Sequence, residues 1–164
     1  MTRSTPVLHL MCGKAAAGKS TLAAGLGAAP NTVVIAEDAW LAALFGDEMT
    51  TLADYVRCAA KLRAAMAPHV VALLKSGVSV VLDFPANTVE TRGWMREMID
   101  LSGAAHEVHL LDVPDDVAKA RLRARNAGGD HPFAVTEEQF DRLAKHFVPP
   151  SEDEGFNVVR HVSE

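Results

Sequence analysis

The sequence reads Gly13-Lys14-Ala15-Ala16-Ala17-Gly18-Lys19-Ser20-Thr21 between an apolar run of strand length, residues 7–12, and a helix-like segment, residues 22–26. The pattern Gly-x-x-x-x-Gly-Lys-Ser in a strand–loop–helix setting is the P-loop, or Walker A, motif. A loop that closes at a helix N-terminus presents backbone N–H groups and the positive end of the helix dipole, and both attract a polyphosphate. The stretch therefore predicts a nucleotide phosphate site.

The residues of this loop have expected parts in that chemistry. Gly13 and Gly18 permit backbone conformations and a close approach that a β-carbon would obstruct. Lys19 is expected to reach the β- and γ-phosphates, and the Ser20 hydroxyl to complete a Mg²⁺ coordination shell. The residues expected to contact the nucleotide are Gly13, Lys14, Ala15, Ala16, Ala17, Gly18, Lys19, Ser20 and Thr21.

Length, charge and cysteine usage narrow the classes of protein to consider. A chain of 164 residues suits one domain, so we expect residues 1–164 to form a single unit. The formal net charge of −5 argues against nucleic acid as the main partner, although it does not exclude a local basic groove. Cys12 and Cys58 lack Cys-x-x-Cys spacing, so a reduced, cytoplasmic setting is expected. The sequence shows neither a signal peptide nor an apolar run of membrane-spanning length, so we expect a soluble protein.

Strand-like and helix-like segments alternate along the chain. Apolar and β-branched runs predict strands at residues 7–12, 32–36, 78–82, 106–111 and 156–162. Helical spacing, with Gly and Pro as punctuation, predicts helices after the P-loop and at residues 39–45, 52–75, 87–101, 114–126 and 136–147. Two of these helices begin with patterns that predict capping boxes, Asn87-x-x-Glu90 and Thr136-x-x-Gln139. The alternation predicts an α/β fold with a mainly parallel sheet.

Acidic residues follow two of the predicted strands, at the edge where ligands of open parallel sheets bind. Asp83 ends an apolar strand of Walker B type, and it is expected to hold Mg²⁺ directly or through water. Asp38 is the candidate base that receives a hydroxyl proton, and Glu37 could exchange roles with it. The alternative for either residue is a helix-capping role.

Several arginines are candidates for binding negative charge. Arg121 and Arg125 lie one helical turn apart, so both can neutralise a transferring γ-phosphate, whereas Arg123 fits a solvated face equally well. The loop at residues 127–132 could hinge or join a lid over the site. Arg63 falls inside the apolar stripe of the helix at residues 52–75, so it either reaches an anionic partner or extends to a nearby polar edge.

Other charged and polar residues give weaker signals. Arg92 and Arg96 lie one turn apart, and they could meet a substrate or occupy an exposed helix face. The seven histidines show no His-x-x-x-His spacing and no Cys/His cluster, so zinc is not expected.

Four segments together carry a family resemblance: the P-loop, Ala-Glu-Asp-Ala-Trp-Leu at residues 36–41, Val-Val-Leu-Asp-Phe at residues 80–84 and Arg-Leu-Arg-Ala-Arg-Asn at residues 121–126. The chain resembles small bacterial P-loop kinases, often named AAA-family ATPases, that are related to chloramphenicol phosphotransferase, the zeta toxins and the kinase domain of polynucleotide kinase. The family loop more often reads Gly-x-Pro-Gly-Ser-Gly-Lys-Ser, so Lys14 and the three alanines depart from it.

The resemblance implies a three-layer P-loop NTPase fold with a five-stranded sheet in the order 2-3-1-4-5. It also implies ATP and Mg²⁺ as the phosphoryl donor, and phosphorylation of a hydroxyl group. Asp38 matches the catalytic aspartate of the family, Arg121 and Arg125 match its lid arginines in a lid region of about residues 121–135, and residues 149–155 match a segment near the adenine.

The leading hypothesis is a kinase that phosphorylates a small molecule, as a monomer or homodimer. Its expected catalytic residues are Lys19, Asp38, Arg121 and Arg125, and its expected Mg²⁺ residues are Ser20 and Asp83. One alternative is a kinase for a polynucleotide or a sugar-nucleotide. A second, from another class, is a regulatory NTPase whose only acceptor is water. The sequence leaves the acceptor, the choice between ATP and GTP, and the division of roles among Glu37, Asp38 and Asp83 open.

Overall fold

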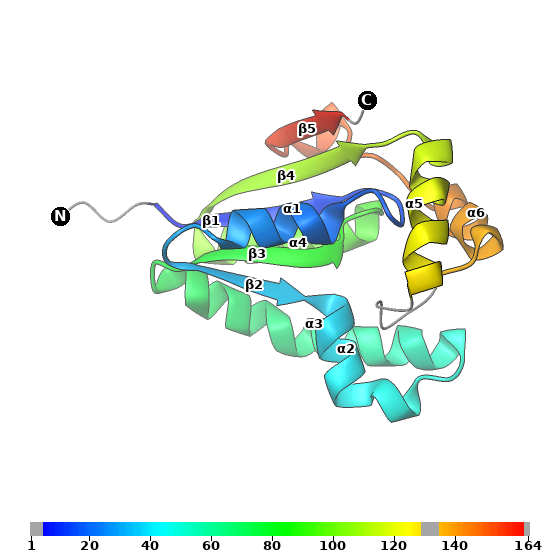
Figure 1. Cartoon of the computed structure of the whole chain (residues 1–164). Helices are drawn as coiled ribbons and strands as arrows, with labels where there is room; N and C mark the ends of the chain where they lie inside the picture. The colour runs from blue at the N-terminus through cyan, green and yellow to red at the C-terminus, as the bar shows by residue number, and fades with distance from the viewer. Residues whose placement is uncertain (1–4, 129–134, 163–164) are drawn as a thin grey trace.

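A five-stranded parallel sheet lies at the centre of the computed structural model, which describes residues 5–128 and 135–162 (Figure 1). The strands lie in the order β2-β3-β1-β4-β5, and every neighbouring pair is parallel. Their bounds are β1 Val7–Cys12, β2 Thr32–Ala36, β3 Ser79–Pro85, β4 Ala105–Asp112 and β5 Val158–Val162. The predicted α/β class and the strand order 2-3-1-4-5 are both confirmed.

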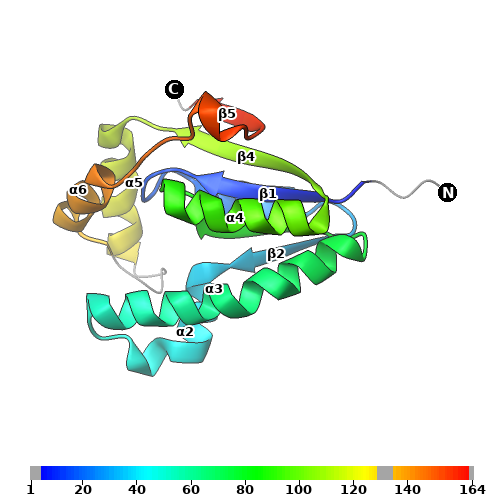
Figure 2. The same cartoon turned by 180° about the vertical axis from the view of Figure 1, so that it is seen from behind.

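Helices cover both faces of the sheet, which gives the three layers expected. The bounds are α1 Lys19–Gly27, α2 Glu37–Phe45, α3 Leu52–Lys75, α4 Val89–Ser102, α5 Asp115–Gly128 and α6 Glu137–Lys145, with short 3-10 helices η1 Gly46–Glu48 and η2 Glu152–Glu154. Helix α1 lies on one face, while α3 and α4 lie on the other (Figures 1 and 2). Helices α5 and α6 lie beyond the carboxyl ends of the strands. None of the helices within the described ranges is both long and apolar enough to cross a membrane.

Helix α3 shows how local sequence sets these elements. Thr51 caps its first turn by accepting from the Asp54 backbone N–H, and the Asp54 side chain accepts from the Thr51 backbone in return. Its apolar residues recur at helical spacing and are buried: Cys58, Ala59, Leu62, Met66, Val70 and Leu74. Gly77, which follows the helix with φ of 88°, ends it in the left-handed conformation that glycine favours. The prediction of a helix over residues 52–75 is confirmed.

The largest core lies between the sheet and helices α3 and α4. Leu8 and Leu10 of β1 and Val80 and Leu82 of β3 are fully buried in it, and Phe84 extends it toward α4. A smaller cluster on the opposite face joins Met11 and Val81 to Ala23 of α1. Fully burying a side chain of this size contributes about 1.5–3 kcal/mol, so the two clusters fix the sheet against its helices.

Most boundaries differ from the sequence prediction by one or two residues, and three of the differences bear on the site. Helix α2 begins at Glu37 rather than residue 39, so Glu37 and Asp38 form its first turn. Strand β3 continues to Pro85, so Asp83 lies within the strand. The capping box predicted at Asn87 is wrong, because Thr88 is the N-cap of α4 and its side chain accepts from the Thr91 N–H. The box at Thr136 and Gln139 is confirmed.

Candidate functional site

The P-loop connects the end of β1 to the start of α1, so the N-terminus of α1 opens onto the loop. Gly18 adopts φ of 103°, which a residue with a β-carbon rarely adopts. A β-carbon on Gly13 would lie 3.2 Å from the β-carbons of both Ala17 and Leu111. Steric constraints therefore favour glycine at both positions, as the sequence predicts.

Lys19, the first residue of α1, folds back over the loop. Its ammonium group donates to the Gly13 carbonyl oxygen at 2.5 Å and to the Lys14 carbonyl oxygen at 3.0 Å. Burial lowers the pKa of Lys19 to about 8; nearby Arg125 lowers it further, while Asp83, Cys12 and Asp38 partly offset the effect. A cation whose charge is disfavoured in this way gains when an anion approaches, and a phosphate supplies one.

Ser20 and Asp83 lie together beside Lys19. The Ser20 hydroxyl donates to Asp83 Oδ2 at 3.0 Å, which joins the first turn of α1 to the carboxyl end of β3. Hydroxyl and carboxylate oxygens are hard ligands of the kind that Mg²⁺ takes in P-loop proteins. The two residues fit the predicted role of holding Mg²⁺.

Glu37 and Asp38 are neighbours in sequence, but their surroundings differ. Glu37 is buried, accepts from the Tyr55 hydroxyl at 2.8 Å and pairs with Arg63 at 3.5 Å. Burial raises the pKa of the Glu37 carboxyl, and the hydrogen bond from Tyr55 opposes that rise. Asp38 is half-buried and lies close enough to Lys19 to raise its pKa. Glu37 thus binds α2 to α3, and Asp38 is the carboxylate of the pair that lies by the loop.

Arg63 reaches an anionic partner, which was one of the two possibilities raised by its place in the apolar stripe. The partner is Glu37, and the Arg63 guanidinium also lies over the Trp94 ring at 5.8 Å. Its Nε is buried without a hydrogen-bond partner among residues 5–128 and 135–162. The contact between α2 and α3 that contains Tyr55 was missed from the sequence, because Tyr55 carries no motif.

The arginines of α5 divide between two directions. Arg121 donates to the Ala17 carbonyl oxygen of the P-loop at 3.3 Å, and Arg125 lies near enough to Lys19 to lower its pKa. Arg123 instead forms an exposed pair with Glu137 at 2.6 Å, which is the solvated-face alternative. Helix α5 therefore presents Arg121 and Arg125 to the loop. The predicted lid at residues 121–135 lies partly outside the described residues, which end at 128 and resume at 135.

A cavity of about 270 Å³ lies beside the loop on the β4 side. Lys14 lines it, donates to exposed Asp115 at 2.8 Å and lies 5.6 Å from the centre of the Phe147 ring. Pro149 and Arg160 also line it. The cavity offers an apolar and aromatic surface next to the phosphate loop, with basic groups at its rim.

Asn87 holds the base of the loop in place. Its side chain accepts from the Gly13 N–H at 2.9 Å and donates to the Gly13 carbonyl oxygen at 2.8 Å. Next to it, the Ala86 N–H donates to the Met11 carbonyl oxygen at 2.8 Å. These bonds join the ends of β1 and β3. Sequence analysis missed this role, because the motif-like spacing around Asn87 indicated a helix cap.

Arg92 is a structural residue, and neither predicted role applies to it. It is fully buried and donates to both carboxylate oxygens of Glu154, at 2.8 and 3.1 Å. It also donates to the carbonyl oxygens of Ala86 at 2.9 Å and Val148 at 2.7 Å. Arg96, one turn later, donates to the Glu154 carbonyl oxygen at 2.9 Å and lies over the Phe156 ring. The two arginines fasten the segment before β5 to α4.

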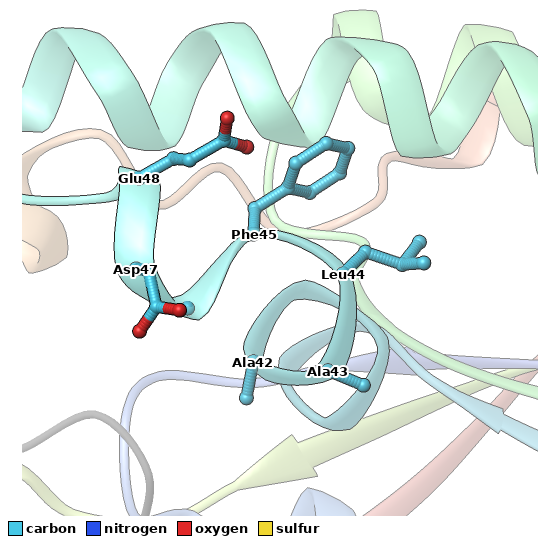
Figure 3. A pocket seen from close by; sticks show the side chains of 7 residues that line it. Ala42, Ala43, Leu44, Phe45, Asp47 and Glu48 are labelled. Carbon is cyan, nitrogen blue, oxygen red and sulfur yellow. The ribbon is translucent and has the colours of Figure 1, made fainter.

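A second hollow, of about 390 Å³, lies at the far end of α2 from Asp38 (Figure 3). One continuous stretch, residues 42–48, lines it. In the close-up, Phe45 and Glu48 point toward the neighbouring helix, and Ala42 and Ala43 lie on α2 itself. At about 1.5 Å of rise per residue, the part of its lining that lies on α2 runs from roughly 6 Å from Asp38, at Ala42, to roughly 10 Å, at Phe45. It takes no part in the site described above.

The fold and the loop define a P-loop protein of kinase-like architecture. The chain belongs to the AAA domain family AAA_33, whose model matches residues 8–150. The fold is similar to that of a candidate kinase from Chloroflexus aurantiacus J-10-fl, at 20% identity and a TM-score of 0.75 over 96% of this chain and 85% of that chain. No curated protein matches the sequence significantly.

Two further solved structures share the fold. A sugar kinase from Janibacter sp. HTCC2649 has 20% identity and a TM-score of 0.66, over 96% of this chain and 85% of that chain. The APS kinase of Mycobacterium tuberculosis, solved with AMPPNP and APS, has 18% identity and a TM-score of 0.61, over 96% of this chain and 88% of that chain. At such identities the likeness establishes the fold, and the chemistry rests on the site.

Proposed function

We propose that the protein is an ATP-dependent kinase that transfers the γ-phosphoryl group of ATP to a hydroxyl group of a small molecule. The observation that supports this most is the gathering of Asp83 and Asp38 around Lys19, where both carboxylates raise the pKa of its ammonium group. A cation for phosphate, a carboxylate for Mg²⁺ and a carboxylate for a hydroxyl proton are the parts that phosphoryl transfer requires.

The donor nucleotide would bind along the P-loop. The loop N–H groups and Lys19 would contact the β- and γ-phosphates, while Ser20 and Asp83 would hold the metal. Bound Mg²⁺ supplies charge neutralisation of the phosphate oxygens. The cavity lined by Lys14, Phe147 and Pro149 is the candidate site for the nucleoside, because it adjoins the loop and offers an aromatic surface.

The acceptor would bind beside Asp38. Its hydroxyl oxygen attacks the γ-phosphorus while Asp38 accepts the hydroxyl proton, and the bond between the γ-phosphorus and the bridging oxygen of ADP breaks. Arg121 and Arg125 would stabilise the transferring group by their charges, which is supported by the Arg121 contact with the Ala17 carbonyl oxygen and by the proximity of Arg125 to Lys19. Asp38 is the proton acceptor in this scheme because it lies near Lys19, whereas Glu37 contacts Tyr55 and Arg63.

The test measures ADP release with a panel of hydroxyl acceptors that includes antibiotics, nucleosides, sugars and amino alcohols. We expect one class to stimulate release in the wild type, and Asp38→Asn to lower the stimulated rate by roughly 10²–10⁴-fold, because its amide accepts no proton. Binding of ATP, measured by calorimetry, should change little. Asp47→Asn is the matched control, since Asp47 is exposed in η1 and lines the distant hollow.

Other outcomes contradict the proposal. If no acceptor stimulates ADP release and Asp38→Asn hydrolyses ATP at the wild-type rate, the protein transfers phosphate only to water. If label passes from ATP to an oligonucleotide 5′-end or to a sugar-nucleotide, but to no small hydroxyl compound, the kinase acts on the larger acceptor instead.

A further inference from the structure

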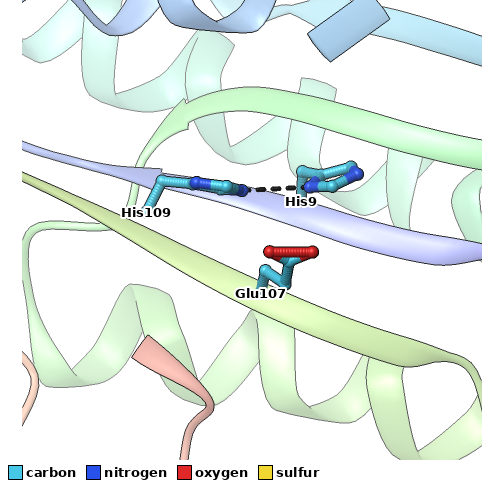
Figure 4. Close-up of side chains that lie close together, drawn as sticks. All are labelled: His9, Glu107 and His109. Atoms are coloured by element: carbon cyan, nitrogen blue, oxygen red, sulfur yellow. Dashed lines mark hydrogen bonds between the residues drawn. The ribbon is translucent and has the colours of Figure 1, made fainter. Parts of the chain in front are cut away.

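Three histidines from three adjacent strands form a row across the sheet, away from the P-loop. His9 Nδ1 lies 3.0 Å from His109 Nε2, and His109 Nδ1 lies 2.9 Å from His161 Nε2. His9 pairs in register with Glu107, whose side chain therefore lies on the same face as the row. One possible ligand atom from each of His9, Glu107 and His109 lies within 4.8 Å of the others (Figure 4).

The row occupies a part of the sheet that α1 leaves uncovered. His9 and Met11 are two residues apart on β1 and so share a face, and Met11 packs against α1. Helix α1 packs mainly over β2 and β3, while His109 lies on β4 and His161 on β5. His109 is 3% exposed, whereas His9 and Glu107 are half-buried and accessible from one side.

We propose that His9 Nδ1, His109 Nε2 and the Glu107 carboxylate bind a divalent transition metal ion of the Zn²⁺ class, with a fourth position open to water. Imidazole nitrogen with one carboxylate is a donor set that suits Zn²⁺, whereas Mg²⁺ prefers oxygen ligands alone. Tetrahedral coordination at usual Zn–N lengths sets two nitrogens about 3.3 Å apart. The observed 3.0 Å requires only a small opening of the pair.

His161 acts as the positioning residue. With His109 Nδ1–H donating to His161 Nε2, the lone pair of His109 is left on Nε2, which faces His9 and Glu107. An orienting hydrogen bond of this kind is the usual companion of a metal-binding histidine.

The ion would hold strands together rather than take part in phosphoryl transfer. His9 precedes Gly13 by four residues of β1, a distance of roughly 13 Å along an extended strand. The ligands belong to β1 and β4, and the positioning residue belongs to edge strand β5. A metal that binds only the folded protein raises its stability by mass action. This inference is therefore independent of the proposed kinase activity.

The experiment titrates Zn²⁺ into protein without a histidine tag, in the presence of millimolar Mg²⁺, and follows heat and thermal unfolding. We expect one Zn²⁺ per chain and an increase in Tm. His9→Gln and Glu107→Gln should each weaken binding at least about tenfold, and His161→Gln should weaken it by about 10–100-fold. His69→Gln, which changes an exposed histidine on α3, should leave binding unchanged. Bound Co²⁺ should show the absorption bands of tetrahedral coordination.

Two results would overturn the proposal: no Zn²⁺ binding by the wild type, or His9→Gln binding within threefold of the wild type. The half-buried position of His9 makes this variant a fair test of the site, and its circular dichroism and melting in chelator establish that it is folded. Glu107→Gln, at another half-buried residue, repeats the test without removing a histidine.

Discussion

Lys19, which is half-buried, and Arg92, which is fully buried, are two cationic side chains whose partners differ. Arg92 meets both oxygens of the Glu154 carboxylate and two backbone carbonyls, so its charge is neutralised within the chain. Lys19 donates to neutral carbonyl oxygens of the P-loop, and burial lowers its pKa to about 8.

The contrast separates a cation that stabilises the fold from one that is prepared for a ligand. A buried charge with a complete set of partners resists removal, because its loss leaves those partners unpaired. A charge that donates its hydrogen bonds to neutral carbonyl oxygens, and whose pKa remains lowered despite nearby carboxylates, gains when an anion arrives. Substitution should therefore affect a different property at each site: stability should fall when Arg92 is replaced, and nucleotide binding should fall when Lys19 is replaced.

The largest effect is expected for Arg92→Ala. The change leaves Glu154 and the carbonyl oxygens of Ala86 and Val148 without their donor, so the free energy of unfolding should drop by about 3–5 kcal/mol in urea titrations. Arg57→Ala is the matched control, because Arg57 forms an exposed pair with Asp54 on α3 and should cost no more than about 1 kcal/mol. Equal losses for the two variants would refute a structural role for Arg92.

A smaller effect, on binding alone, is expected for Lys19→Ala. The variant should retain the wild-type free energy of unfolding to within about 1 kcal/mol, because the removed charge was disfavoured by burial. Its Kd for ATP should rise about 100-fold, the equivalent of one or two hydrogen bonds to charged groups. Calorimetry with Mg²⁺ and ATP measures this. An affinity within threefold of the wild type would show that the loop does not bind phosphate through Lys19.

Elements with local signals could be predicted from the sequence. The helix over residues 52–75 has a period, a cap and a terminal glycine within its own segment, and its predicted and observed bounds agree. The P-loop is likewise one continuous stretch. By contrast, Asn87 meets Gly13 across 74 residues, and Arg92 meets Glu154 across 62. Neither contact belongs to a sequence motif with a recognisable spacing. The same holds for the histidine row, whose members come from three different strands.

The different surroundings of Glu37 and Asp38 show in more detail what the sequence could not predict. Both were candidates for the same proton-accepting role, and the sequence placed them just before a helix. They instead form the first turn of α2, where adjacent residues point about 100° apart. One of them meets Tyr55 and Arg63 while the other lies near Lys19. A shift of two residues in the start of α2 therefore changes which neighbours each carboxylate meets, and such boundaries are the least predictable feature of a sequence.

The smallest expected effect is the uptake of protons when ATP binds, and it tests the difference between Lys19 and Arg92 most directly. Phosphate oxygens should return the pKa of Lys19 from about 8 toward its ordinary value of 10.5, so ATP binding should take up protons. We expect uptake of about 0.1 proton at pH 7 and about 0.9 at pH 9, where the phosphates of ATP are fully ionised. Affinity should accordingly hold below pH 8 and weaken as the pH rises above it. Calorimetry in buffers of different ionisation enthalpy measures the uptake.

Lys19→Arg is the control for this proton uptake. Its guanidinium stays charged at every pH used, so binding by this variant should involve almost no proton uptake at pH 9. Uptake of the same size in the wild type and in Lys19→Arg would assign the proton to another group. The absence of proton uptake by the wild type at pH 9 would mean that Lys19 is already fully charged before ATP binds, and the difference between Lys19 and Arg92 would then lie in geometry alone.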